Sequence, residues 1–305
     1  MTSTASSAEP VGPVVAFVGL GAMGAPMVRR LAGSGARLKL HDIRAEVAEG
    51  LAEEVGATTA RSAAEAGDGA QVAVTMVADH TVVRQVVMGE GGLAETLAPG
   101  SLVVDMSSSY PIATRALGEE LGARQIALVD APVSGGVKRA VAGSLAIMLG
   151  GDDAAALDRA QPLLSAMGTV YRTGPLGSGH ALKALNNFVS SAGLAAACEA
   201  VLVGRRFGLD PAVVVDVLNA STGRNNATEN KLAQFILNED FGSGFAMALM
   251  AKDVGFADQL AGELGCEAPT LSAMRALWRD ASTSLGTGAD HTEIIRHLAA
   301  RGGGA

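Results

Sequence analysis

Aromatic residues, cysteines and charged residues are all scarce in this sequence, and each shortage narrows what the protein can be. Phe, Trp and Tyr make up only 3% of the 305 residues, so Ala, Val, Leu and Met must fill the core. The two cysteines, Cys198 and Cys266, exclude a disulfide framework and fit a reducing compartment. Charged residues make up 18%, and their net charge of −8 argues against nucleic acid or an anionic membrane as a partner.

The sequence also lacks a secretion signal and a metal-binding pattern. Residues 1–13 are rich in Ser, Thr, Ala and Pro but have no basic start or apolar stretch, so we expect a disordered tail there. The most apolar long segment, residues 188–204, is interrupted by Glu199, which favours a buried helix over a membrane span. The five histidines show no ligand spacing, so no metal site is expected. We expect a cytoplasmic protein.

Short apolar strands alternate with helices in the first 177 residues. Strands are expected at residues 14–20, 37–42, 71–77, 101–106, 126–129, 144–149 and 170–173. Helices are expected at residues 26–32 and 44–55 and between most of the later strands. Such alternation predicts an α/β domain with a doubly wound sheet of the Rossmann type, which we assign to residues 14–177.

The remaining residues show only helical patterns. Helices are expected at residues 179–207, 211–218, 229–237, 246–264 and 270–281. The first of these is long and apolar on nearly every face, which predicts an interdomain helix that is covered on several sides. We therefore expect an all-helical C-terminal domain at residues 178–300, with the active site in the cleft between the two domains.

A glycine motif directly follows the first expected strand. The segment GLGAMG fits G-x-G-x-x-G and opens a helix, whose N-terminal N–H groups favour an anion. Gly19 permits the tight turn, Gly21 lets the backbone approach a pyrophosphate, and Gly24 allows close packing of the helix on the sheet. The loop residues expected to bind a dinucleotide are Gly19, Gly21, Ala22, Met23 and Gly24.

An acidic residue completes this fingerprint. Asp42 ends the second expected strand, about 20 residues after the motif, where a carboxylate binds the adenosine ribose hydroxyls. It also repels a 2′-phosphate, which favours NAD. Arg44 lies two residues further on and could accommodate that phosphate, so NADP remains an alternative.

Three further segments place polar residues in apolar surroundings: DAPVSGG at residues 130–136, GSGHALKALNN at 177–187 and LMAKD at 249–253. Together with GLGAMGAPM at residues 19–27, these motifs resemble the β-hydroxyacid dehydrogenase family, and most closely its hydroxyisobutyrate branch. The resemblance covers about residues 14–295. It implies an NAD(P)-dependent oxidoreductase that moves a hydride between the nicotinamide and a small 3-hydroxy acid or its semialdehyde.

The resemblance implies that Lys183 is the general acid/base. Its own context agrees, because Ser178 or Gly179 would cap the helix and place Lys183 in the early turns. The helix dipole and burial in a cleft both disfavour the ammonium and lower its pKa, which suits proton transfer near neutral pH. Asn187 lies four residues on, on the same helix face, and matches the family's substrate-contacting asparagine.

Other site residues follow from the resemblance by position. Ser134, Gly135 and Gly136 match the loop that binds the substrate carboxylate, where small residues expose backbone N–H groups. Lys138 and Arg139, just beyond, are read as a solvated face. The remaining residues expected to contact the cofactor are Val77, Ala78, Ser108, Phe245 and Lys252.

The resemblance leaves the substrate open. A tartronate or succinic semialdehyde reductase, or a glyoxylate reductase, would fit the same motifs, and a nucleotide-binding regulator without catalysis is a weaker alternative. His180 lies near Lys183 but is assigned no function. The apolar surface of the 179–207 helix exceeds what one side of a small domain can cover, which predicts a homodimer or homotetramer formed through the helical domain.

Overall fold

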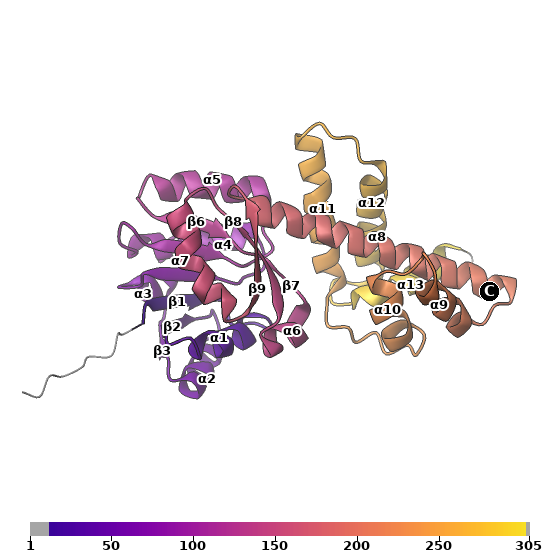
Figure 1. Cartoon of the computed structure of the whole chain (residues 1–305), viewed down its shortest axis with the longest axis horizontal. Coiled ribbons are helices and arrows are strands. Elements are labelled where there is room, and N and C mark those ends of the chain that lie inside the picture. Colours follow the sequence, from indigo (N-terminus) through magenta and orange to yellow (C-terminus); the bar gives the residue numbers. More distant parts are fainter. Residues whose placement is uncertain (1–11, 303–305) are drawn as a thin grey trace, which may run out of the picture. The chain divides into compact units, whose positions relative to one another are not determined.

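The computed structural model describes residues 12–302, and the chain divides into two compact units (Figure 1). The first unit ends at Leu182 and the second begins at Lys183. Residues 1–11 of the expected N-terminal tail lie outside the described residues.

The first unit is built on a nine-stranded mixed sheet. Its strands are β1 (Val14–Val18), β2 (Arg37–His41), β3 (Thr58–Thr59), β4 (Val72–Thr75), β5 (Leu102–Asp105), β6 (Ala127–Asp130), β7 (Val133–Ser134), β8 (Leu145–Gly150) and β9 (Gly168–Gly174). The order is β3-β2-β1-β4-β5-β6-β8-β7, and β9 pairs with β8. In this order the six strands from β3 to β6, which include β1 and β2, run parallel, whereas β8 is antiparallel to β6 and β7. The order reverses between β1 and β4, which is where this kind of sheet binds its ligand.

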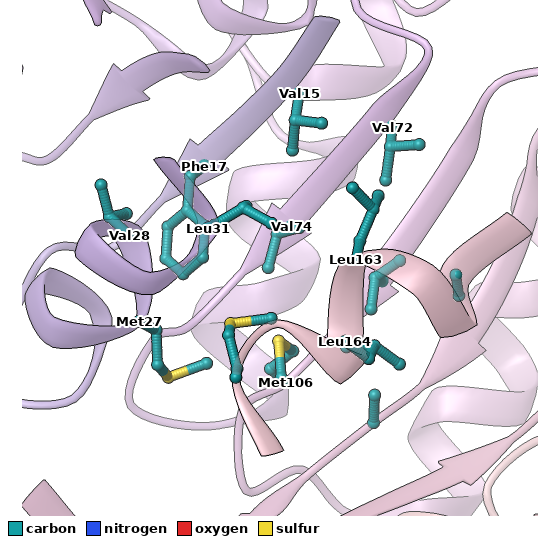
Figure 2. Close-up of a cluster of buried hydrophobic side chains, with 14 of the residues drawn as sticks. Val15, Phe17, Met27, Val28, Leu31, Val72, Val74, Met106, Leu163 and Leu164 are labelled. Atoms are coloured by element: carbon teal, nitrogen blue, oxygen red, sulfur yellow. The ribbon is translucent and has the colours of Figure 1, made fainter. Parts of the chain in front are cut away.

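Helices cover both faces of the sheet. They are α1 (Gly24–Ala32), α2 (Ala45–Val55), α3 (Ala63–Gly67), α4 (His80–Met88), η1 (Leu93–Glu95), α5 (Pro111–Gly122), α6 (Gly136–Ala142) and α7 (Ala154–Ser165). Side chains alternate along β1, so that Val15 and Phe17 face α1, α2 and α7, while Ala16 and Val18 face α3, α4 and α5. Figure 2 shows the first of these cores, where Phe17 and Val74 lie near Met27 and Leu31 of α1. The Rossmann-type prediction is confirmed.

Most expected strands extend one or two residues beyond the observed strand at one end or both, whereas β6 and β8 end one residue later than expected and β9 is longer at both ends. The first ends at Val18 rather than at residue 20, because Gly19 takes a φ of +96° and turns the chain. Strand β4 likewise ends at Thr75 rather than at residue 77. The two-residue strands β3 and β7 carry too short a pattern to be recognised in the sequence.

The second unit is helical. Its elements are most of α8 (Ser178–Phe207), α9 (Pro211–Ala220), α10 (Asn226–Asn230), η2 (Leu232–Ile236), α11 (Met247–Glu263), α12 (Pro269–Leu285), η3 (His291–Glu293) and α13 (Ile294–Arg301). Among the described residues of this unit the only β pairing is an isolated bridge between Ala246 and Asp290. Trp278 lies at 0% exposure in a core that Leu194, Val254 and Ile294 share.

One expectation for this unit is corrected. The single helix expected at residues 229–237 is two elements that break at Lys231, and the first of them, α10, starts earlier because a capping box between Asn225 and Thr228 stabilises its N-terminus. Helix α8 leaves part of its apolar surface open, since Val189, Val203 and Phe207 are 66%, 68% and 83% exposed. Helix α13 was not anticipated.

Among the described residues, only α8 is long and apolar enough to cross a membrane by length and composition. The core helix of a soluble protein meets the same criteria, and less than half of its most apolar stretch is buried. The buried polar residues Lys183 and Asn187 on this helix agree with the prediction of a core helix.

Candidate active site

The glycine loop has the geometry that a pyrophosphate needs. A Cβ on Gly19 would overlap the carbonyl oxygen of Met76, and a Cβ on Gly24 would overlap that of Gly19, so both positions require glycine for close packing. Gly21 differs, because a Cβ there would meet no atom of the described chain within 4 Å. Gly21 and Ala22 are exposed at the start of α1, where no side chain caps the first N–H groups. This open, donor-rich surface fits a phosphate group.

Asp42 holds the glycine loop through its carboxylate. Its Oδ2 accepts a hydrogen bond from the Leu20 N–H at 2.7 Å, and its Oδ1 accepts one from the Arg44 N–H at 3.0 Å. Partial burial favours the neutral carboxyl, but these two N–H groups and the Arg44 guanidinium outweigh it and hold the pKa of Asp42 below its ordinary value. Asp42 is therefore a carboxylate at neutral pH, and it also pairs with Arg44 at 3.3 Å.

The loops after β4 and β5 meet at the carboxyl edge of the sheet. The Val77 N–H donates to the Ser107 Oγ at 3.0 Å, which ties the two loops together. Ser108 is half-buried between Ser107 and Ser109, both of which are buried, and Ala78 is exposed. Sequence-predicted Val77 and Ser108 are thus brought near each other, at the edge where such sheets bind nicotinamide cofactors.

The predicted carboxylate loop lies between β7 and α6. Ser134 ends β7, and the φ values of Gly135 and Gly136 are +128° and +65°. A Cβ on Gly136 would meet no atom of the described chain within 4 Å, so its backbone is open to a ligand. Lys138 and Arg139 are exposed, as expected of a solvated face.

Lys183 lies in a buried polar cluster of the second unit. We call the set of Lys183, Asn187, Lys252 and Asp253 the lysine cluster. Lys183 is 9% exposed, Asn187 6% and Asp253 2%. The Asn187 Nδ2 donates to the Asp253 Oδ2 at 2.6 Å, and the Lys252 Nζ lies 3.3 Å from the Asp253 Oδ1. The cluster joins α8 to α11, and Asn187 and Lys252, which are 65 positions apart in the sequence, share the Asp253 carboxylate.

The charges in the lysine cluster affect the pKa of Lys183. Burial is the largest cause and lowers the pKa of the ammonium, because a charge in an apolar setting loses its hydration. The Asp253 carboxylate raises it in part, and the Lys252 ammonium lowers it again. The net direction of the pKa is downward, as expected, which favours the neutral amine that a proton acceptor needs.

Asp253 also fixes the orientation of the Asn187 amide. A carboxylate oxygen only accepts hydrogen bonds, so the Asn187 side chain must turn its Nδ2 toward Asp253. Its Oδ1 then points the other way and accepts a hydrogen bond from the Asn186 Nδ2 at 3.2 Å. The amide oxygen of Asn187 is thereby set as an acceptor.

The expected cap of α8 is wrong. The helix begins at Ser178, whose Oγ is hydrogen-bonded to the Thr173 Oγ1 at 2.7 Å rather than to the helix end. Asp130, at the end of β6, supplies the capping carboxylate instead, since it accepts from the N–H groups of Gly177 and His180. A carboxylate at this end complements the helix dipole.

Phe245 is positioned by a second polar cluster of the helical unit. The Asp290 carboxylate accepts from the Gly244 and Phe245 N–H groups at 2.9 and 3.3 Å, and the His291 N–H donates to the Phe245 carbonyl at 2.9 Å. The His291 Nε2 lies 2.7 Å from the Lys231 Nζ. Burial, opposed by Asp290, lowers the pKa of Lys231 to about 8.

Sequence reasoning missed the aspartates that organise these sites. Asp253 stood in the quoted LMAKD segment but carried no assigned role, and Asp130 began the DAPVSGG segment. Asp253 and Asp130 each lie beside an assigned residue or within an assigned motif, and that position in the sequence could have indicated their role. Asp290 had no such signal, because Gly244 and Phe245, whose N–H groups donate to it, lie 45 residues or more away.

The structure thus gathers the predicted residues into two sets. The glycine loop, Asp42, Val77, Ser108 and the carboxylate loop belong to the first unit, and the lysine cluster and Phe245 to the second. Within residues 12–302 there is no group of three or more His, Cys, Asp or Glu side chains that could hold a metal ion.

Two family models together match most of the chain. Residues 14–175 match the NAD binding domain of 6-phosphogluconate dehydrogenase. Residues 177–298 match the model described as NAD-binding of NADP-dependent 3-hydroxyisobutyrate dehydrogenase. Both halves are therefore of a type associated with nicotinamide dinucleotides, which agrees with the open glycine loop.

Individual relatives cover nearly the whole chain. An NAD-dependent L-serine dehydrogenase of Pseudomonas aeruginosa is 36% identical over 272 residues, which are 87% of this chain and 91% of the relative. A 3-hydroxyisobutyrate dehydrogenase of the same organism is 36% identical over 250 residues, 80% and 83% of the two chains. The structure of the Mycobacterium tuberculosis 3-hydroxyisobutyrate dehydrogenase with L-serine is 32% identical, with a TM-score of 0.85 over 94% of this chain and 99% of that one. Two family models, relatives at this identity and a matching fold lead to one conclusion: the chain belongs to the β-hydroxyacid dehydrogenase family and is an NAD(P)-dependent dehydrogenase that acts on a CH–OH group.

Proposed function

We propose that this enzyme oxidises the terminal CH₂OH of a small 3-hydroxy acid, with 3-hydroxyisobutyrate as the leading candidate, or reduces the matching semialdehyde. The observation that carries this proposal is the lysine cluster, in which a buried lysine with a lowered pKa lies with an oriented amide. L-Serine is a second candidate, because the serine dehydrogenase and the hydroxyisobutyrate dehydrogenase are equally similar to this chain. Both molecules carry a CH₂OH on the carbon that bears the carboxylate.

Each predicted residue has a defined task in this proposal. When bound, the cofactor supplies a nicotinamide that accepts or donates the hydride. Lys183, as the neutral amine, takes the hydroxyl proton during oxidation and returns it as the ammonium during reduction. The Asn187 amide holds the reacting oxygen, and Ser134, Gly135 and Gly136 bind the substrate carboxylate with a hydroxyl and backbone N–H groups.

The cofactor contacts are part of the same proposal. Gly19, Gly21, Ala22, Met23, Gly24 and Asp42 would bind the pyrophosphate and adenosine ribose. Val77, Ala78, Ser108, Phe245 and Lys252 would bind the nicotinamide half. We propose the same division at the level of domains, with cofactor binding in residues 14–177 and substrate binding and self-association in residues 178–300. A cytoplasmic location also stays a prediction.

Replacing Lys183 tests the proposed role of the lysine. Lys183→Ala should lower turnover by about 10²-fold or more, the size of a lost acid/base, while the Kd for NAD stays close to the original value. Lys138→Ala is the matched control, because Lys138 is exposed on α6 and should leave turnover unchanged. Substrates for the assay are 3-hydroxyisobutyrate, L-serine, glycerate and 4-hydroxybutyrate with NAD and NADP, read at the nicotinamide absorbance. Near-normal turnover of Lys183→Ala over the full pH range would overturn the proposal.

The exposed apolar residues of the helical unit support self-association. Val203 and Phe207 on α8 and Val213 and Val217 on α9 are each more than half exposed, and such patches mark interfaces. We expect a homodimer or homotetramer, which light scattering would detect. A mass near the 30.6 kDa of one chain at micromolar concentration would contradict this. Val203→Asp should shift an oligomer toward the monomer.

A further inference from the structure

A network of polar side chains is buried at the carboxyl edge of the sheet in the first unit. We call it the His180 network, and its members are Thr75, Asp105, Ser107, Ser109, Thr114, Asp130 and His180. Every member is at most 3% exposed. Buried polar groups are costly unless they are hydrogen-bonded, and networks of this kind fix one arrangement of the elements that they join.

His180 lies at the centre of this network. Its Nδ1 is 2.8 Å from the Thr114 Oγ1, and its Nε2 is 3.1 Å from the Ser107 carbonyl oxygen. A carbonyl oxygen only accepts hydrogen bonds, so the Nε2 carries a proton and donates it to Ser107. The imidazole therefore has one fixed orientation, and it ties the start of α8 to the loop after β5.

Asp105 extends the network to the proposed cofactor loops. Its Oδ1 accepts from the Thr75 Oγ1 and the Ser107 N–H, both at 3.0 Å, and its Oδ2 accepts from the Ser109 Oγ at 2.7 Å. The Ser107 Oγ in turn accepts from the Val77 N–H at 3.0 Å. Ser107 thus holds the loop that carries Val77 through its hydroxyl and the His180 ring through its backbone carbonyl.

Asp130 connects the network to the first turn of α8. Its Oδ1 accepts from the Gly177 N–H and its Oδ2 from the His180 N–H, both at 2.8 Å. The approach is close, because a Cβ on Gly179 would come within 2.8 Å of the Asp130 Oδ2. Asp130 also lies four residues before Ser134, so one residue contacts the start of α8 and leads into the carboxylate loop.

We propose that His180 is a positioning residue for hydride transfer. Through Ser107 and Thr114 its ring keeps the first turn of α8 aligned with the loops that carry Val77 and Ser108, and Lys183 follows three residues later in the same helix. This inference rests on the proposed role of Lys183. A side chain that only stabilised the fold would affect unfolding but not the rate of the folded enzyme, whereas misplacement of a reacting group by about 1 Å can cost roughly 10²-fold in rate.

The test compares three variants of the full chain. His180→Leu removes both ring hydrogen bonds, and His180→Gln keeps groups that can donate to Ser107 and accept from Thr114. His297→Leu is the matched control, because it removes another buried imidazole whose Nδ1 contacts a hydroxyl, that of Ser284, at 2.8 Å. The readouts are the single-turnover rate of NAD reduction by folded protein, the Kd for ADP-ribose, and the melting temperature.

We expect His180→Leu to lower the single-turnover rate by about 10- to 100-fold and to leave the Kd for ADP-ribose unchanged, since the glycine loop and Asp42 lie outside the network. His180→Gln should recover most of the rate, and His297→Leu should lower the melting temperature alone. Folded His180→Leu with the original rate would overturn the inference, as would a His180→Gln that is as slow as His180→Leu.

Two further variants keep the outcome decisive. If His180→Leu does not fold, Thr114→Val removes only the partner of Nδ1, and an unchanged rate in that variant refutes the inference. Lys183→Ala separates the two proposals. If it keeps its turnover, the proposed function fails, whereas an inactive Lys183→Ala beside a fully active His180→Leu refutes the role of His180 alone.

Discussion

Two glycines of one motif should respond in opposite ways to the same substitution. A Cβ on Gly24 would overlap the Gly19 carbonyl oxygen, and because that atom belongs to the backbone, α1 or the loop must move by about 1 Å. Such overpacking costs about 3 kcal/mol at most, and the better helix propensity of alanine offsets about 1 kcal/mol of it. Gly24→Ala should therefore lower the free energy of unfolding by about 2 kcal/mol, or the melting temperature by roughly 4–8 °C.

Gly21→Ala should leave the fold intact and weaken cofactor binding. The added methyl group meets no atom of the described chain within 4 Å, so we expect the melting temperature of the apo protein to stay within about 2 °C. The same methyl group would occupy the space that the pyrophosphate needs, and we expect at least a roughly tenfold higher Kd for NAD, which is about 1.4 kcal/mol.

Thermal melts with and without NAD separate these effects. Saturating NAD should raise the melting temperature of the original enzyme, because a ligand that binds only the folded state stabilises it by mass action. At the same NAD concentration the increase should be smaller for Gly21→Ala. The reasoning fails if Gly21→Ala melts as early as Gly24→Ala, or if it binds NAD as tightly as the original enzyme.

The remaining predictions concern two aspartates. Asp42→Ala should raise the KM for NAD and improve the relative use of NADP. The substitution removes the carboxylate that repels a 2′-phosphate, and it releases Arg44, the partner of Asp42 at 3.3 Å. An original enzyme that prefers NADP would show that Arg44 dominates. Asp253→Asn keeps an acceptor for Asn187 but removes the charge that raises the pKa of Lys183, so that pKa should fall further. Oxidation needs the neutral amine and increases as pH rises through this pKa, so the rise in kcat/KM should move to lower pH; an unmoved profile would contradict the coupling.

Local patterns in the sequence were enough to predict the sheet and the glycine loop, and the family resemblance singled out Lys183. A parallel strand between two helical layers is apolar on both faces, and the turn at Gly19 depends on the backbone of the GLGAMG segment itself. Both features can therefore be recognised in a short stretch of sequence. The positions of Lys183 and Asn187 on one helix face likewise follow from their spacing of four residues.

Only the tertiary structure determined which polar groups act together. Asp253 meets Asn187 across 66 residues, Asp130 caps α8 from 47 residues away, and His180 contacts Ser107 across 73 residues. No sequence period encodes such pairs, because a side-chain hydrogen bond depends on where packing brings two distant segments. The sequence could therefore name Lys183, but its lowered pKa and the orientation of Asn187 depend on charges and acceptors that the folded chain brings to them.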